Sequence, residues 1–181
     1  GIYVTISILT SNQSISAPAP DAEGIVRLAD VDFSDSVVII SYDCFAIYPG
    51  VYYSAGDFAA DQVREGRSWY YGGREMEQYG TLRLVLNLVP GGTYAVSARN
   101  ASYAQRLYID GKEYDAIGVA GESKESTVPA SRRYTIGFTA QAETTEIILH
   151  YAAFVHSDGG GVYPMDIGSV SNVARLEQKR V

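Results

Sequence analysis

The stretch QRLYIDGKEY, residues 105–114, alternates apolar and polar side chains on both sides of an Asp-Gly pair. Leu107 and Ile109 fall on the same face of an extended chain, because side chains in a strand alternate between two faces. Asp110-Gly111 supplies two residues that tolerate positive φ, as a two-residue primed turn requires. The stretch therefore predicts a β-hairpin with its turn at this pair.

Runs of strand length recur outward from this hairpin, separated by clusters of Gly, Pro, Asn and Asp at spacings of roughly 8–12 residues. The predicted strands are 2–9, 36–42, 81–88, 91–98, 105–110, 113–118, 134–139, 145–154 and 162–167. Many short strands with little helix are typical of an all-β sandwich or barrel. No repeat period or low-complexity tract divides the sequence, so we expect one domain over residues 1–181.

Two connecting segments carry specific expectations. Pro90-Gly91-Gly92 is typical of a turn, so the flanking strands 81–88 and 91–98 are expected to form a second hairpin. The stretch SAGDFAADQVRE, residues 54–65, is the one with a helical pattern. Asp57 is expected to cap a helix of about two turns there.

Composition excludes several classes of protein. The chain has 14 basic and 21 acidic residues and a net charge of −7, which makes nucleic acid an unfavourable partner. No apolar run reaches the ~20 residues needed to span a bilayer, so any membrane attachment would come through adjoining segments. Cys44 is the single cysteine, which permits no internal disulfide and is expected to be buried. The 15 tyrosines suit half-buried strands and also surfaces that bind through a ring and a hydroxyl.

Motifs for catalysis and cofactors are missing from the sequence. It holds no phosphate-binding glycine loop, no HExxH, no CxxC and no G-x-S-x-G elbow. His150 and His156 could pair as metal ligands with Asp158, but a hydrogen-bonded structural role for His150 is the expectation. We therefore predict a domain that is not an enzyme and that needs no cofactor or metal.

Four motifs in order resemble one family of bacterial receptors. They are FAIYPGVYYSAGDF (45–58), QYGTLRLVLNL (78–88), ASYAQRLYIDGKEYDAIGVAGESKESTVP (101–129) and GGGVYPMDIG (159–168). The resemblance is to the extracellular jelly-roll domains of seven-transmembrane receptors with diverse intracellular signalling modules. It implies an antiparallel jelly-roll β-sandwich like the galactose-binding domains, including those of β-galactosidase-type glycoside hydrolases.

In such a jelly roll, the 105–110 strand and its turn project toward an end of the sandwich that is lined by loops. Aromatic rings stack on the C–H faces of sugars, and polar side chains bond the hydroxyls. The candidate ligand-binding residues at this end are Trp69, Tyr103, Arg106, Asp110 and Arg132. A structural role stays open for each, and for Arg106 it is cover of the sheet surface or pairing with a carboxylate. The loop HSDGGGVY, residues 156–163, is the alternative location.

Three functions remain open at the level of sequence. The resemblance implies an extracytoplasmic sensor domain that binds a small molecule or carbohydrate, anchored through helices outside this chain. The alternative is a carbohydrate-binding accessory module of a secreted glycoside hydrolase. The third is a domain that binds a protein partner. Any of the three could act as a homodimer. Fold alone does not choose among these functions.

Overall fold

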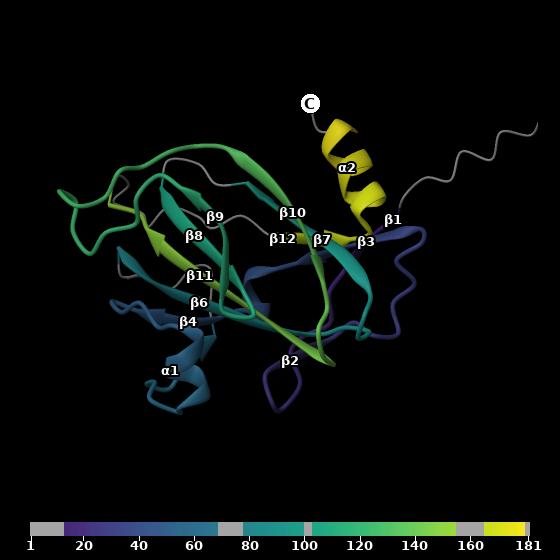
Figure 1. The fold of residues 1–181 in the computed structure, drawn as a ribbon, viewed down its shortest axis with the longest axis horizontal. Helices are drawn as coiled ribbons and strands as arrows, with labels where there is room; N and C mark the ends of the chain where they lie inside the picture. The colour runs from purple at the N-terminus through teal and green to yellow at the C-terminus, as the bar shows by residue number, and fades with distance from the viewer. Residues whose placement is uncertain (1–12, 69–77, 100–102, 155–164, 180–181) are drawn as a thin grey trace, which may run out of the picture.

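Two β-sheets pack face to face in the computed structural model, which describes residues 13–68, 78–99, 103–154 and 165–179 (Figure 1). The smaller sheet has the order β1 (Gln13–Ser16), β3 (Ser36–Ile40), β12 (Met165–Gly168), β7 (Thr93–Arg99), β10 (Arg133–Thr139). The larger sheet has the order β5 (Arg67–Ser68), β4 (Ala46–Pro49), β6 (Tyr79–Asn87), β11 (Thr144–Ala152), β8 (Ala104–Ile109), β9 (Lys112–Ile117), and β2 (Ile25–Arg27) pairs with β6. The predicted all-β jelly-roll sandwich is confirmed. The expected strand 2–9 lies outside the described residues.

The core lies between the sheets and follows the period-two pattern of the strands. In the larger sheet, Ile47, Leu82, Leu149 and Leu107 are register partners on four adjacent strands, and all four are buried. The same alternation places the odd-numbered neighbours of Leu82 on the outward face. Cys44 is also buried, as expected of a small apolar side chain.

The Asp-Gly hairpin is confirmed. Asp110 has φ +48° and Gly111 has φ +79°, so both turn residues adopt the left-handed backbone that a primed turn needs. Ile109 and Lys112 are the register partners that flank the turn. The Asp110 carboxylate accepts a hydrogen bond of 2.9 Å from the amide of Glu146, which ties the turn to the start of β11.

The second predicted hairpin is wrong. Pro90-Gly91-Gly92 does form a turn, but β6 belongs to the larger sheet and β7 to the smaller one. The connection therefore crosses from one layer of the sandwich to the other. Tyr94 follows the turn, and its hydroxyl accepts a hydrogen bond of 3.1 Å from the amide of Val89. This bond holds the two ends of the crossing together.

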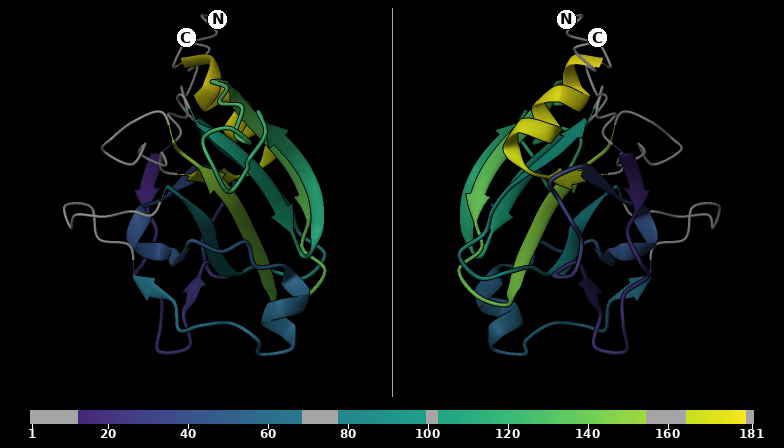
Figure 2. Two further views of the ribbon diagram at one scale, coloured as in Figure 1. Left: turned by 90° about the vertical axis from the view of Figure 1, so that its left-hand side faces the viewer. Right: turned by 90° about the vertical axis from the view of Figure 1, so that its right-hand side faces the viewer.

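The helices differ from expectation in two ways. Helix α1 covers only Ala55–Ala59, and its N-cap is Ser54, whose hydroxyl accepts from the amide of Asp57. Asp57 is thus the third helical residue of a capping box rather than the cap itself. A ten-residue helix, α2 (Val170–Lys179), was not predicted from the sequence. It packs against the smaller sheet, at the opposite end of the molecule from α1 (Figure 2).

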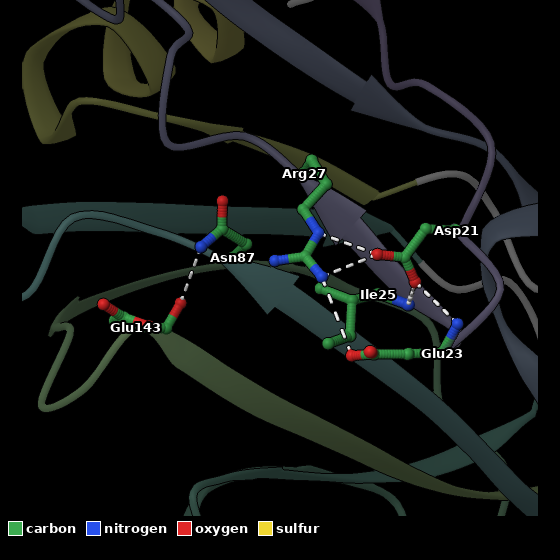
Figure 3. A network of polar contacts seen from close by, with 6 residues as sticks. All are labelled: Asp21, Glu23, Ile25, Arg27, Asn87 and Glu143. Atoms are coloured by element: carbon green, nitrogen blue, oxygen red, sulfur yellow. Dashed lines mark hydrogen bonds and ion pairs between the residues drawn. The ribbon is translucent and has the colours of Figure 1, made fainter.

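A short carboxylate network orders the turn that leads into β2. The Asp21 carboxylate accepts hydrogen bonds from the amides of Glu23 and Ile25, each 2.9 Å, and from Arg27 Nε at 2.7 Å (Figure 3). The bond from the amide of Ile25 is the main reason that the pKa of Asp21 lies below its usual range. The network shapes the turn before β2, which then pairs with β6 in parallel. The pairing of β1 with β3 is also parallel, so the sandwich is not wholly antiparallel.

Candidate functional site

The outward face of the larger sheet carries a row of polar side chains on its central strands. Thr81 on β6, His150 on β11 and Arg106 on β8 are register partners across three adjacent strands. Their sequence neighbours Leu82, Leu149 and Leu107 point into the core, so these three side chains point away from it. A row of this kind on a sheet face is a platform on which a ligand or another segment can lie.

Part of this platform is covered by the link between β4 and α1. Thr81 Oγ1 accepts a hydrogen bond of 2.9 Å from the amide of Tyr53 and donates one of 2.8 Å to the carbonyl of Val51. His150 Nε2 lies 2.7 Å from the carbonyl oxygen of Tyr53. A carbonyl only accepts, so Nε2 carries the hydrogen. The structural role expected for His150 is confirmed.

Two aromatic rings pack against the ring of His150. The ring of Tyr52 stacks on it with centroids 4.8 Å apart, and the ring of Tyr108 lies 5.0 Å from it at a tilt. The Tyr52 hydroxyl lies 2.9 Å from the carbonyl oxygen of Gly121 and 3.2 Å from that of Tyr151. Burial, with a further contribution from the charge of Glu122, raises the pKa of Tyr52 well above its usual range. Tyr52 is thus a neutral hydrogen-bond donor that links three segments of the chain.

Arg106 differs from Arg83 on the same face. Arg83 donates to Glu146 at 2.7 Å, and its guanidinium lies 4.4 Å from the ring centroid of Phe58. Arg106 is half-buried, and within the described part of the chain its guanidinium makes no hydrogen bond or ion pair. It interacts electrostatically with Tyr52 and His150. We call Arg106, Tyr108, His150 and Tyr52 together the Arg106 face.

Of the four predicted ligand-binding residues that the structure describes, only Arg106 lies on this face with its polar group unengaged by other described residues. Tyr103 is 1% exposed, so its ring packs in the core and offers no face to a ligand. Asp110 holds the amide of Glu146. Arg132 forms an ion pair with Asp115 and donates to the carbonyl of Ala116 at 3.0 Å. Trp69 lies outside the described residues, as does the alternative loop 156–163.

The candidate residues predicted from the sequence include neither Tyr52 nor Tyr108. A signal for Tyr108 was present, because it stands two residues after Arg106 in a strand and must share its face. No such signal exists for Tyr52, which reaches the face from a link between elements. Tyr134 is buried, and its hydroxyl accepts a hydrogen bond of 3.2 Å from Gln105 Nε2.

The described residues provide no metal centre and no membrane-spanning helix. No three His, Cys, Asp or Glu side chains among them are grouped as metal ligands. His156 and Asp158, considered with His150 from the sequence, lie outside the described residues. Neither α1 nor α2 is long and apolar enough to cross a membrane.

Acidification is expected to destabilise the fold through His150. Burial lowers the pKa of His150 below its ordinary value of 6.5, the bond to Tyr53 raises it, and the charge of Arg106 lowers it again. The unfolded chain therefore takes up this proton at a higher pH than the folded chain. The free energy of unfolding should fall as the pH drops through about 6.5, and the loss should end below the folded pKa.

Urea unfolding of the native chain and of His150→Gln between pH 7.5 and 5 measures this loss. The glutamine can still donate to the Tyr53 carbonyl but does not titrate. The stability advantage of the native chain over the variant should shrink as the pH falls. The lowered pKa of Asp21 and Asp57 places their titration below this window. An advantage that stays constant over the whole range would contradict the prediction.

No family model and no curated protein matches this chain. Among solved structures, a family 35 carbohydrate binding module from Clostridium thermocellum is 16% identical, with a TM-score of 0.43, and the match covers 75% of this chain and 99% of that module. A beta-glucosidase from Kluyveromyces marxianus in complex with glucose is 12% identical, with a TM-score of 0.40, covering 93% of this chain and 20% of the enzyme. A beta-glucosidase from Paenibacillus barengoltzii has a TM-score of 0.26 at 14% identity, over 50% of this chain and 10% of that one. At TM-scores this low, these likenesses assign neither a ligand nor an activity to the chain.

Proposed function

We propose that this chain is a carbohydrate-binding domain with no catalytic activity of its own, and that the sugar binds on the Arg106 face. The observation that carries the proposal is a half-buried arginine that makes no hydrogen bond or ion pair with any described residue and lies beside aromatic rings. Five N–H donors on a rigid plane are then available to a ligand. The whole chain acts as one domain in this proposal.

The chemistry of the face suits a sugar ring. Tyr108 lies two residues from Arg106 on β8, so a flat apolar ring and a set of donors are presented side by side. Aromatic rings pack against the C–H faces of a pyranose, while fixed donors choose among its hydroxyl groups. Arg83 cannot serve in the same way, because Glu146 and Phe58 already occupy its guanidinium.

Thermal unfolding of the whole chain in the presence of a panel of saccharides tests this proposal. A ligand that binds only the folded state raises its stability by about 2.7 kcal/mol at one hundred times Kd. For a chain of this size we expect the melting temperature to rise by roughly 5–10 °C. Tyr108→Ala should abolish the rise, and the exposed Val89→Ala should leave it unchanged. A rise that survives Tyr108→Ala would place the sugar elsewhere, and no rise with any saccharide would overturn the proposal.

The parent protein of the domain is a second question. The order of the four sequence motifs supports an extracytoplasmic sensor domain of a membrane receptor, whereas an accessory module of a secreted glycoside hydrolase needs only the binding face itself. Both functions place the domain outside the cytoplasm. The complete reading frame separates them, since apolar runs of ~20 residues after this region would favour the receptor. A neighbouring glycosidase barrel would favour the accessory module.

A further inference from the structure

Arg83 and Arg106, which both lie on the outward face of the larger sheet, differ in how their charge is balanced. Arg83 has Glu146 at 2.7 Å as a direct counter-ion. Arg106 has no carboxylate within ion-pair distance in the described part of the chain, although it is half-buried. A partly desolvated cation without a counter-ion gains more from an incoming anion than an exposed one does.

The groups that face Arg106 do not neutralise its positive charge. His150 is its register partner on β11 and is held neutral by burial near neutral pH. Tyr52 is a neutral donor, since its pKa is raised. Ala116 is the register partner on β9 and carries no charge. The negative charges that act on its neighbours are those of Glu113, which acts on His150, and Glu122, which acts on Tyr52.

We propose that the Arg106 face selects saccharides that carry a single carboxylate, and that Arg106 is the residue that recognises this group; the inference rests on the proposed function. A guanidinium binds a carboxylate through two parallel hydrogen bonds, a geometry that a neutral hydroxyl group cannot reproduce. Glu113 and Glu122 limit the selection to a low charge. In a chain of net charge −7, they repel a polymer with many negative groups while one carboxylate still reaches Arg106.

Binding of the whole chain to an array of neutral, carboxylated and sulfated glycans, followed by calorimetry with methyl glucoside and methyl glucuronide, tests the inference. The native chain should bind the glucuronide at least about tenfold more tightly than the glucoside, as a charge-assisted pair implies. Arg106→Gln should remove most of this difference, because losing the charged fork weakens glucuronide binding more than glucoside binding. Arg106→Lys keeps the charge without the fork, and should retain an intermediate preference.

Lys112→Gln is the matched control, because it removes one positive charge from the same hairpin at an exposed position. It should leave the preference within about twofold of the native value, since an exposed charge is screened by salt. Equal binding of neutral and carboxylated glycans, or a preference that survives Arg106→Gln, would overturn this inference and leave the proposed function standing. Stronger retention of sulfated than of carboxylated glycans would also overturn it. Retention of no glycan at all would overturn the proposed function as well.

Discussion

Leu82→Ala is expected to cost about 2–5 kcal/mol of folding free energy, the range for large-to-small changes in a packed core. Leu82 has no exposed surface and stands in the middle of β6, between Ile47 on β4 and Leu149 on β11. Its neighbours come from both sides of the same sheet, so they cannot close the cavity without distorting the strand pairing. We expect the melting temperature to fall by about 4–20 °C.

Thermal and urea unfolding measure this loss, with Val89→Ala as control. Val89 follows the same strand but is 48% exposed, so its truncation leaves no cavity. Its effect should stay within about 0.5 kcal/mol, as for surface positions in general. Equal losses in the two variants would mean that Leu82 is not a core residue.

Among the glycines that the structure describes outside the strands, Gly118→Ala is expected to be the most damaging substitution. Gly118 has φ +65°, and an added Cβ would lie 2.0 Å from the carbonyl oxygen of Val128. That oxygen already accepts a hydrogen bond of 2.8 Å from the amide of Val119. The positive φ costs alanine about 1–2 kcal/mol, and relief of the clash adds about 1–3 kcal/mol.

Gly91→Ala separates these two contributions. Gly91 has φ +79°, but an added Cβ would meet no atom within 4 Å, so only the backbone cost applies. The difference between the two variants in urea unfolding should therefore be about 1–3 kcal/mol. Hydrogen exchange at the amides of Val119 and Val128 should also accelerate in Gly118→Ala alone. Identical stability of the two variants would show that the loop after β9 yields to the added methyl group.

Local chemistry made the strands and one turn predictable. Asp110-Gly111 leaves little choice of turn, because few other residue pairs accept positive φ at both positions. Residues 81–88 were likewise predicted as a strand, and their alternation matches the burial of Leu82, Leu84 and Leu86 in β6. Ser169 before α2 was a signal that could have been used, since its hydroxyl accepts a hydrogen bond of 3.2 Å from the amide of Asn172 at the start of the helix.

The predictions that were wrong or incomplete concern features that depend on distant parts of the chain. A Pro-Gly-Gly turn is compatible with a hairpin and with a crossing between sheets, and β7 joined the smaller sheet because β10 and β12 pair with it there. Tyr103 follows a polar segment, and it is buried as a member of the hydrophobic core, which contains residues from both sheets. The Arg106 face was only partly predicted, because Tyr52 reaches it from the link between β4 and α1. In this link, Tyr53 contacts His150 across a sequence separation of 97 residues. The residue pattern of a single strand does not predict a contact with a segment so distant in the sequence.

The place of β12 has a consequence for how this chain folds during synthesis. β12 lies between β3 and β7 and pairs with both, although it is encoded far after either of them. At the usual rate of about 5–20 residues per second, the ribosome keeps the two strands waiting for several seconds. Until Met165–Gly168 emerges, the nascent smaller sheet has a gap at its centre with unpaired backbone on both sides. Such open edges attract other strands, so this interval is when the nascent chain most needs a chaperone.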